Sequence, residues 1–324
     1  MTNLENVLVS VLCITYNHGK YLKQALDGIL IQKTNFDYEV IIGDDCSTDN
    51  SREIILQYKE KFGNKLRILF HEHNLGATEN VRRIEAYATG RYIISLETDD
   101  YWSDPYKLQK QVDYLETHPD VLAVAHRCMV VDEDSKPAKV VYPECKSRVY
   151  KVGHYRNWIL PGQYTTIMYR NFYLNDMSVD FKYRAKASSY GPGDRILVFM
   201  VMSKGEIHCL PDVMSCYRYV LKGGSSFSAN NRITHLQMVK YYDCYFEYAG
   251  EYKVSKPLLD AVKMLYLEEL TASVYIEKST DRKTYKQIKR EKNISIKTYL
   301  YMLMHVVYRL SGRLFCKLRG MKCI

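Results

Sequence analysis

The sequence lacks the patterns that identify several common protein classes. Its nine cysteines are odd in number, widely scattered and never spaced as C-x-x-C, which argues against a disulfide framework and a thiolate zinc site. Neither G-x-G-x-x-G nor G-x-x-x-x-G-K-[ST] occurs, so dinucleotide-binding dehydrogenases and P-loop enzymes are excluded as well. Free thiols in this number fit a reducing cytosol best.

Targeting and membrane-spanning segments are not indicated either. Residues 1–6 contain Glu5 and no basic residue, and the apolar run 7–14 ends at polar Thr15, so we expect a buried strand there and not a signal peptide. The apolar stretch 299–307 is interrupted by His305 and falls far short of the roughly 20 residues needed to span a bilayer. We find no internal repeat and no low-complexity tract.

What the sequence does contain is enough apolar material for one large core and an uneven distribution of charge. Of its 324 residues, 47% are hydrophobic, so we expect one main domain with an appendage. The formal charge is +9, yet residues 282–324 hold twelve Lys or Arg against one acid, Glu291. The basic character therefore belongs to the tail, and the remainder of the chain is slightly acidic.

Hydrophobic periodicity predicts an α/β fold in the first part of the chain. Short apolar runs at 7–14, 38–44, 66–70, 92–96 and 121–131 alternate with helical patterns at 20–30, 51–62, 78–89 and 105–117, which is typical of βαβ units. Ser47 or Asp49 is suited to cap the second helix. We predict a mostly parallel central sheet flanked by helices, with the polar residues that follow its strands converging in one crevice.

The pattern changes after residue 131. It is looser over 132–193, predicts a helix at 194–204, two short strands within 207–219 broken at Pro211 and a Gly/Ser loop at 222–228, and is entirely helical after Asn231. We therefore predict a domain over residues 1–230, with parts 1–131 and 132–230, followed by a helical C-terminal region over 231–324 that ends in a basic amphipathic tail.

Polar segments follow the first four predicted strands. They are Thr15-Tyr16-Asn17, Asp44-Asp45-Cys46-Ser47-Thr48-Asp49, Asn74-Leu75-Gly76 and Glu97-Thr98-Asp99-Asp100-Tyr101-Trp102. Alone, the last segment is typical of a solvated turn as well as of a carboxylate site for a divalent cation. In this order and spacing, the four segments resemble family 2 glycosyltransferases with the GT-A fold, of the type that builds bacterial capsule or O-antigen polysaccharides. The resemblance covers residues 7–131 and continues more weakly to about residue 228.

The resemblance implies a nucleotide site and a metal site. Tyr16 would lie against a uracil ring between Thr15 and Asn17, Asp45 would accept a hydrogen bond from the base, and Asp44 would shape the same strand end. Asp100 would be the direct ligand of Mn²⁺ or Mg²⁺, and Asp99 would hold the ribose or a metal-bound water. For Asn80, contact with the donor sugar and a structural role both stay open. The residues assigned to the donor and metal are Thr15, Tyr16, Asn17, Asp44, Asp45, Asn80, Asp99, Asp100 and Arg218.

A catalytic base is implied by a later segment. Gly191-Pro192-Gly193-Asp194 resembles the family's Gly-Asp element, in which the Asp takes the acceptor proton in an inverting displacement; Asp194 is also suited to be a helix cap. Pro211 to Arg218 and Gly223-Gly224-Ser225 resemble the family's Tyr-Arg element and its loop over the diphosphate. Two positions depart from the family, because Val220 stands where a His is common and Thr98 where Gly is usual. The third metal ligand is therefore unassigned, and Arg218 or Lys222 could neutralise phosphate.

The implied reaction is transfer of a sugar from a nucleotide-diphosphate donor, a UDP-hexose or UDP-N-acetylhexosamine, to a hydroxyl of a saccharide acceptor that is lipid-linked. Residues 1–131 would bind the donor and 132–230 the acceptor. One alternative is a nucleotidyltransferase, but such an enzyme would carry a Gly-rich basic loop where this chain has Thr15-Tyr16-Asn17-His18. Another is a protein that binds nucleic acid through its tail, but no recognised nucleic-acid module is present, so we expect no nucleic-acid partner.

The basic tail predicts a helix with two different faces. Apolar residues recur at three- and four-residue steps among cations, at Ile296, Leu300, Leu303, Val307, Leu310 and Leu314. Such a helix can lie on an anionic bilayer, or it can dock on the catalytic core. We expect a cytoplasmic protein that is peripheral at the inner face of the cell membrane. The C-terminal helices could also pair with a second copy in a homodimer.

Overall fold

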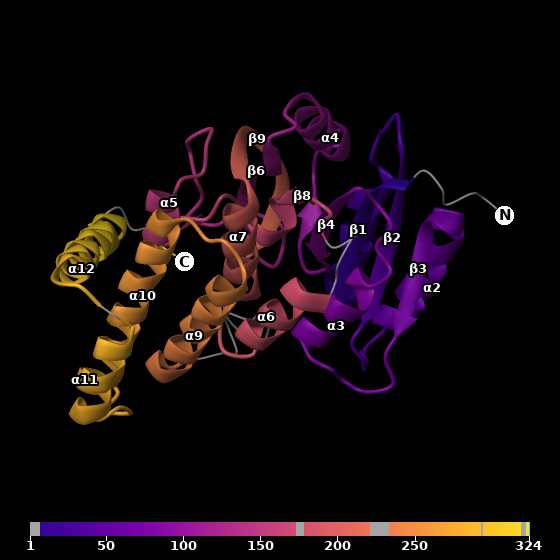
Figure 1. Cartoon of the computed structure of the whole chain (residues 1–324). Coiled ribbons are helices and arrows are strands. Elements are labelled where there is room, and N and C mark those ends of the chain that lie inside the picture. The colour runs from indigo at the N-terminus through magenta and orange to yellow at the C-terminus, as the bar shows by residue number, and fades with distance from the viewer. Residues whose placement is uncertain (1–6, 173–177, 221–232, 293, 319–321, 324) are drawn as a thin grey trace.

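A central sheet with helices on both faces forms the body of the molecule (Figure 1). The structure, a computed structural model, describes residues 7–172, 178–220, 233–292, 294–318 and 322–323. The strands are β1 (Val7–Thr15), β2 (Asp37–Asp44), β3 (Leu66–Phe70), β4 (Tyr92–Glu97), β5 (Tyr101–Trp102), β6 (Val121–Val131), β7 (Val140–Val141), β8 (Met168–Arg170), β9 (Glu206–Arg218) and β10 (Lys322–Cys323).

The helices alternate with the strands in the first part of the chain and follow one another in the last. They are α1 (Gly19–Leu30), α2 (Ser51–Phe62), α3 (Ala77–Glu85), α4 (Lys107–Thr117), α5 (Val152–Arg156), α6 (Ser178–Ser188), α7 (Gly193–Lys204), α9 (His235–Glu251), α10 (Lys256–Tyr275), α11 (Arg282–Glu291) and α12 (Ile296–Leu318), with short 3₁₀ turns η2 (Gly63–Lys65) and η3 (Tyr164–Thr166).

The main sheet has the order β3-β2-β1-β4-β8-β6-β9-β5. Strands β3, β2, β1 and β4 pair in parallel, as do β6 and β9, whereas β8 is antiparallel to both β4 and β6 and β5 is antiparallel to β9. The prediction of an α/β fold with a mostly parallel sheet and a helical C-terminal region is confirmed. All five strands expected up to residue 131 are present.

Three local features differ from what the sequence led us to expect. Strand β8 was not expected, and it separates β4 from β6. Residues 207–219 do not form two strands, because β9 is continuous. Cys209 pairs with Ala125 of β6, but the next pair is Val213 with Arg127. Pro211 therefore lies in a bulge, where the N–H that proline lacks is not needed for pairing. The residue that precedes α2 is Asn50, whose side chain does not cap the helix, although the Asp49 carboxylate accepts from Ser51 N at 2.9 Å.

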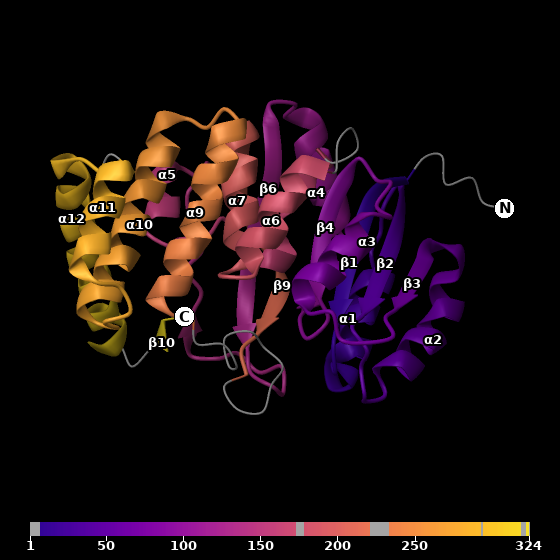
Figure 2. The ribbon, with the colours of Figure 1, turned by 60° about the horizontal axis from the view of Figure 1, so that its bottom comes forward.

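Two hydrophobic cores lie on opposite faces of the sheet. Because successive strand residues face opposite sides, Val9 and Val11 of β1 join the core under α1, α2 and α4, whereas Leu12 and Ile14 join the other core. That second core also contains residues of α6, α7, α9 and α10, which lie next to one another across this face (Figure 2). Helices α9 and α10 are therefore part of the core that also contains Leu12 and Ile14 of β1. The expected boundary near residue 230 lies outside the described residues.

The last two helices lie at the far end of the molecule from β3 (Figure 1). Within the described ranges, no helix combines the length and the hydrophobicity that crossing a bilayer would require.

Candidate active site

Hydrogen bonds join the ends of β1 and β2, whose polar segments the sequence predicted to converge. Asp45 N donates to Thr15 O at 3.0 Å, and Asn17 N donates to Ser47 Oγ at 2.9 Å. Asn17 Oδ1 accepts from Thr48 N at 2.8 Å. Asn17 has a φ of 55°, a left-handed conformation that asparagine tolerates better than most residues. The loops that follow β1 and β2 are therefore held together by hydrogen bonds.

The two aspartates after β2 hold the loops around them. Asp45 accepts from Leu75 N at 2.6 Å and from Gly76 N at 2.9 Å, which connects the second motif to the third. Asp44 is fully buried and accepts from Arg52 Nε at 2.6 Å, so it shapes the strand end as the resemblance implied. The contact of Asp45 with a nucleobase stays a prediction.

Tyr16 and Asn80 have different environments, although both were assigned to the donor. The Tyr16 side chain is 39% exposed at the end of β1, where a flat ring can reach it. Asn80 is 1% exposed; it donates to Gly43 O at 2.9 Å and its Oδ1 bonds to His71 Nε2 at 3.1 Å. Of its two open interpretations, these contacts support the structural one.

The carboxylates after β4 face two directions. Glu97 and Asp99 are half-buried and their side chains form no hydrogen bond with the described part of the chain, whereas Asp100 is 1% exposed. Asp100 Oδ1 accepts from Arg218 N at 2.7 Å and its Oδ2 accepts from Gln163 Nε2 at 2.9 Å. Burial raises the pKa of Asp100 well above its usual range, and the charges of Asp99 and Glu97 raise it further. Its role as the direct metal ligand, which the resemblance implied, stays a prediction.

Arg218 is also placed inward, and its assigned contact with the donor phosphates stays a prediction. Its guanidinium is 1% exposed and lies 4.3 Å from the centroid of the Tyr21 ring. The nitrogens donate to Asp99 O, Asp132 O, Glu133 O, Ser135 Oγ and Gln24 Oε1. These bonds brace the fold, while Nη2, which donates only to Gln24 Oε1 among them, keeps one N–H without an acceptor in this set. Lys222 and the segment Gly223-Gly224-Ser225 lie outside the described residues.

His18 had no role from the sequence, and Thr98 was expected only to tune the fit of the donor, yet the two join the first motif to the fourth. His18 Nδ1 lies 2.9 Å from Thr98 Oγ1, and Thr98 Oγ1 also donates to Ile14 O at 3.1 Å. Burial lowers the pKa of His18, although the nearby charges of Asp99 and Asp49 oppose this shift. Thr98, where the family usually has Gly, therefore cross-links β1 and β4.

Asp194 lies in the first turn of α7, after Pro192 at the N-cap position. It is half-buried, and its Oδ1 accepts from Arg195 N at 2.7 Å. It does not occupy the cap position that was its alternative role. Burial raises the pKa of Asp194, and the charge of Arg195 only partly opposes this. A raised pKa suits a group that must take up a proton near neutral pH.

Glu97 connects the two halves of the site, and sequence reasoning gave it no role. Its pKa is raised to about 8 by burial first, and then by the charges of Asp99 and Asp194. Asp194 is thus close enough to act on the carboxylates after β4, although 95 residues separate Asp99 from it. No periodic signal could have found Glu97, because β4 ends at this residue and a turn follows, in which Asp100 N donates to Glu97 O at 2.9 Å.

The donor set fits a divalent cation. Among the described residues, no group of three or more His, Cys, Asp and Glu side chains is arranged to hold a metal. Two mutually repelling carboxylates, Glu97 and Asp99, can nevertheless share a cation whose other ligands are phosphate oxygens and water, as is usual for Mg²⁺. A cation there would also relieve the repulsion that raises the pKa of Glu97.

In sheet order and in the loops gathered at its strand ends, the molecule has the GT-A fold of glycosyltransferases. TarS of Staphylococcus aureus, in complex with UDP-GlcNAc, superposes over 92% of this chain and 79% of its own with a TM-score of 0.56 and 17% identity. A mannosyltransferase of Pyrobaculum calidifontis, in complex with GDP-Man and Mn²⁺, covers 92% of this chain and 84% of its own, with a TM-score of 0.52 and 14% identity.

Sequence comparison identifies the family. The model of Glycosyl transferase family 2 matches residues 10–178, and the chain belongs to that family. An uncharacterised protein of Mycobacterium bovis is 34% identical over 216 residues, which are 65% of this chain and 58% of that protein. A Bacillus subtilis protein named for teichuronic acid biosynthesis, TuaG, is 37% identical over 115 residues, 36% of this chain and 44% of its own length. The chain thus spans less than two thirds of each. Family membership favours a glycosyltransferase over the nucleotidyltransferase and nucleic-acid-binding alternatives.

Proposed function

We propose that the protein transfers a sugar from a UDP-sugar, a UDP-hexose or UDP-N-acetylhexosamine, to a hydroxyl of a saccharide acceptor with inversion at the anomeric carbon. The observation that carries this proposal is the position of Asp194, whose charge acts on Glu97 beside Asp99. We infer that the base and the cation-binding pair lie near one another beyond the strand ends. The complexes of TarS with UDP-GlcNAc and of the mannosyltransferase with GDP-Man support a nucleotide-sugar donor.

Mn²⁺ or Mg²⁺ would be held by Asp99 and Glu97, not by Asp100 as first expected. The side chains of Asp99 and Glu97 are half-buried and form no hydrogen bond among the described residues, whereas both oxygens of Asp100 already accept hydrogen bonds. The cation would supply positive charge for the diphosphate of the donor. The Mn²⁺ in the complex of the mannosyltransferase supports this choice of cofactor.

Asp194 would act as the general base. In a single displacement, the acceptor hydroxyl oxygen forms a bond to the anomeric carbon as the bond from that carbon to the diphosphate oxygen breaks. The hydroxyl proton moves to the Asp194 carboxylate, and UDP leaves with the electron pair of the broken bond. Burial raises the pKa of Asp194, which brings its proton affinity closer to that needed in the transition state.

The experiment measures UDP release with Mn²⁺ from a panel of UDP-hexoses and UDP-N-acetylhexosamines in the wild type and in Asp194→Asn. We expect kcat to fall by about 10²–10⁴-fold, the range for loss of a general base, while UDP affinity stays the same. Ser189→Ala, at an exposed residue directly after α6, is a matched control. Wild-type kcat in Asp194→Asn would refute the assignment of the base.

A role in bacterial surface polysaccharide synthesis follows from the family resemblance and is supported by the name of TuaG. We propose that the acceptor is lipid-linked and that the protein works in the cytoplasm, peripheral at the inner face of the cell membrane. The surface of α11 and α12 supports this location.

Helix α12 docks on the core by one face and leaves an apolar face uncovered. Met302 and His305 are buried, and His305 Nδ1 bonds to Glu268 Oε2 of α10 at 2.8 Å. On the opposite side, five apolar side chains are between 56% and 81% exposed: Ile296, Leu300, Leu303, Met304 and Val307. The two sequence-based interpretations of this helix are therefore compatible, because different faces of it serve them.

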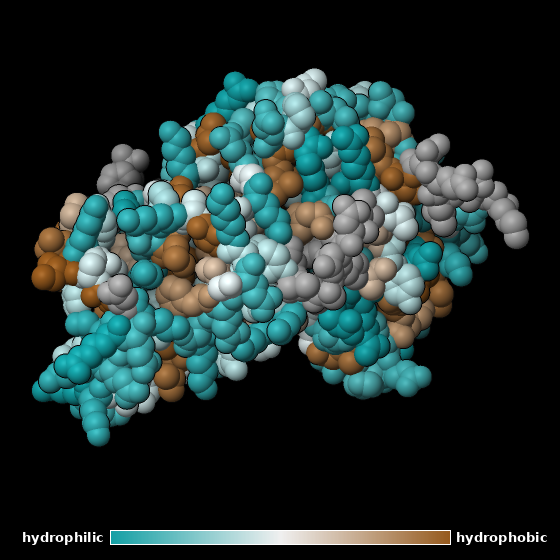
Figure 3. Space-filling model, viewed as in Figure 1, coloured by the Kyte–Doolittle hydropathy of each residue, from teal (hydrophilic) through white to brown (hydrophobic). Residues whose placement is uncertain are grey.

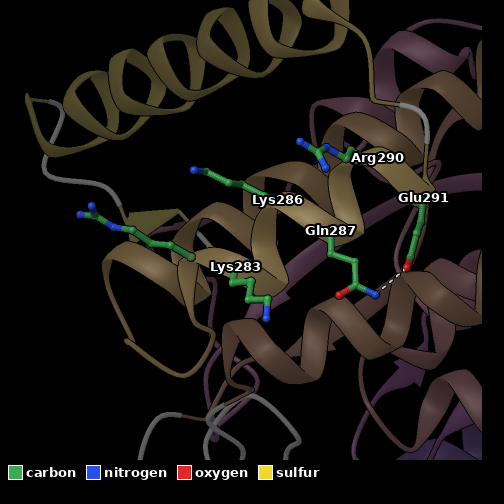
Figure 4. A pocket seen from close by; sticks show the side chains of 6 residues that line it. Lys283, Lys286, Gln287, Arg290 and Glu291 are labelled. Atoms are coloured by element: carbon green, nitrogen blue, oxygen red, sulfur yellow. Dashed lines mark hydrogen bonds between the residues drawn. The ribbon is translucent and has the colours of Figure 1, made fainter.

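Helix α11 adds positive charge beside this apolar face. A pocket of ≈ 740 Å³ is lined by Arg282, Lys283, Lys286, Gln287, Arg290 and Glu291, and Figure 4 shows Lys286 and Arg290 projecting from the helix. Its acid, Glu291, accepts from Gln287 at 2.8 Å. None of the four cations forms an ion pair with another residue that the structure describes. Hydrophilic α11 and the apolar edge of α12 lie side by side on the surface (Figure 3).

Adjacent cationic and apolar surfaces match an anionic bilayer, where headgroups meet the cations and acyl chains meet the apolar residues. We expect full-length protein to sediment with phosphatidylglycerol vesicles and not with phosphatidylcholine vesicles. Leu300→Asp with Leu303→Asp should abolish sedimentation while kcat on soluble substrates is retained. Unchanged sedimentation would contradict the proposal. So would a lipid-independent dimer that the same changes dissociate, since α12 would then pair with a second copy.

A further inference from the structure

Helix α9, from the C-terminal region, contacts the backbone immediately before Asp194. Tyr241 Oη donates to Pro192 O at 2.6 Å, and Pro192 is the N-cap residue of α7. Tyr245 Oη, one turn further along α9, donates to Tyr241 Oη at 2.6 Å. Both tyrosines are completely buried. A chain of two hydroxyls thus ends on the carbonyl where the helix that carries Asp194 begins.

The ring of Tyr241 also fixes the segment that precedes this carbonyl. A Cβ added to Gly191 would lie 2.7 Å from Tyr241 Cδ2, closer than real Cβ atoms approach, so the ring packs directly against the Gly191 backbone. On its other side, Gly191 N donates to Ala187 O, in the last turn of α6, at 3.1 Å. Residues 191 and 192 are therefore held between α6 and α9.

Arg195, the residue after Asp194, is held in place by two aromatic rings. The Arg195 guanidinium lies 3.9 Å from the Trp158 ring centroid and 4.5 Å from that of Tyr155. Its Nη2 donates to Tyr155 O at 3.0 Å. Contacts with Tyr241 before Asp194 and with Tyr155 and Trp158 after it thus fix the backbone on both sides. These contacts determine where the Asp194 carboxylate lies.

We propose that Tyr241 is a positioning residue for Asp194, so that α9 sets the distance between the base and the reacting hydroxyl. The inference rests on the proposed function, in which Asp194 is the base. A general base works only when its oxygen is within hydrogen-bonding reach of the proton it removes, and a misplacement of about 1 Å can cost on the order of 10²-fold in rate. Tyr241 is completely buried and its hydroxyl donates to Pro192 O, so we expect it to act through the position of Asp194.

The test replaces Tyr241 with Phe, which keeps the ring against Gly191 and removes the donor to Pro192 O. With the UDP-sugar that the wild type turns over fastest, and with Mn²⁺, we expect kcat to fall about tenfold, with KM and UDP affinity unchanged. Tyr242→Phe is the matched control. Tyr242 is the next residue on α9 and is equally buried, but its hydroxyl has no hydrogen-bond partner in the described part of the chain, so its kcat should stay within about twofold of the wild type.

A double-mutant cycle separates positioning from general loss of structure. If Tyr241 acts through Asp194, adding Tyr241→Phe to Asp194→Asn should cause no further loss of kcat. A further tenfold loss in that background would show a structural role and overturn the inference. Wild-type kcat in Tyr241→Phe, with Asp194→Asn inactive, would overturn it too and leave the base intact. An active Asp194→Asn would instead refute the proposed function.

Gly191→Ala is a second variant for the case in which Tyr241→Phe does not fold. Its methyl group presses on the Tyr241 ring and leaves every hydroxyl in place. We expect a loss of kcat of at least tenfold with unchanged UDP affinity, and thermal unfolding confirms that the variant is folded. Wild-type kcat would contradict the positioning role.

Discussion

The buried carboxylates at the strand ends have hydrogen-bond partners within the protein, whereas the charged groups on the surface of α11 have no ion-pair partners among the described residues. At the strand ends, both carboxylate oxygens of Asp45 and of Asp100 accept hydrogen bonds from backbone or side-chain donors. On α11, Lys286 and Arg290 have no ion pair among the residues that the structure describes. Fixed partners make a site that depends on the position of single atoms, whereas unpaired charges make a surface that can adapt to a diffuse partner. Single substitutions should therefore have large effects in the first region and small effects in the second.

After Asp194→Asn, the largest effect is expected at Asp99, and comparison with Asp100 sharpens the contrast inside the site. Asp99→Asn should lower kcat about 10²–10³-fold and remove the response to Mn²⁺, because an amide is a poor replacement for a carboxylate ligand. Asp100→Asn should keep the response to Mn²⁺ and lose mainly stability. UDP release measured against Mn²⁺ concentration checks both. Loss of the metal response in Asp100→Asn alone would restore Asp100 as the ligand.

A large effect on stability is expected at Arg218. Arg218→Leu removes the donors to three backbone carbonyls, those of Asp99, Asp132 and Glu133, so the free energy of unfolding should fall by about 2–4 kcal/mol. Denaturant unfolding measures this. Arg67→Leu, an exposed arginine on β3, is the control and should change it by less than about 0.5 kcal/mol. A drop in UDP affinity at unchanged stability would return Arg218 to the donor site.

A moderate effect is expected from pH. Burial raises the pKa of Asp194, so the base gains its proton at a higher pH than an ordinary aspartate, and kcat should fall on acidification before such a residue would titrate. The measurement is kcat against pH at saturating Mn²⁺ and donor, with folding followed by circular dichroism. Activity that stays constant down to about pH 4, the usual range of an aspartate, would show that Asp194 is not perturbed.

The smallest effect is expected on α11. Lys286→Ala should weaken binding to phosphatidylglycerol vesicles by about fivefold, since each cation near an anionic surface contributes about 1 kcal/mol. Lys59→Ala, an exposed lysine on α2, should leave vesicle binding unchanged. Complete loss of binding from Lys286→Ala would mean that the surface holds a specific ligand, and the contrast between the two regions would fail.

The sequence predicted most of what depends on neighbouring residues. Apolar runs located five strands, and the loops after β1 and β2 converge because parallel strands end at one edge of a sheet. Orientation was harder to predict. Asp99 and Asp100 are adjacent in the chain, yet only contacts with Gln163 and Arg218, distant in sequence, show that Asp100 faces inward.

Other features could not be predicted because they depend on tertiary packing. Strand β8 has three residues, too few for a periodic signal, and its position between β4 and β6 is set by the sheet. Asn80 lies on a helix that was expected, but only its bonds to Gly43 and His71 decide between donor contact and structure. The contact of Tyr241 with Pro192 joins segments 49 residues apart, and no local pattern indicates it.

The core shared by β1 and α10 limits how proteins of this kind can diverge. Leu12 of the first strand and Leu265 of the tenth helix belong to one hydrophobic cluster, so recombination near residue 230 would leave apolar surfaces of both pieces without their counterparts. A lineage that changes the sugar donor must therefore keep a sheet face that fits the helices behind it. New specificities should arise by substitution within loops more readily than by exchange of whole segments.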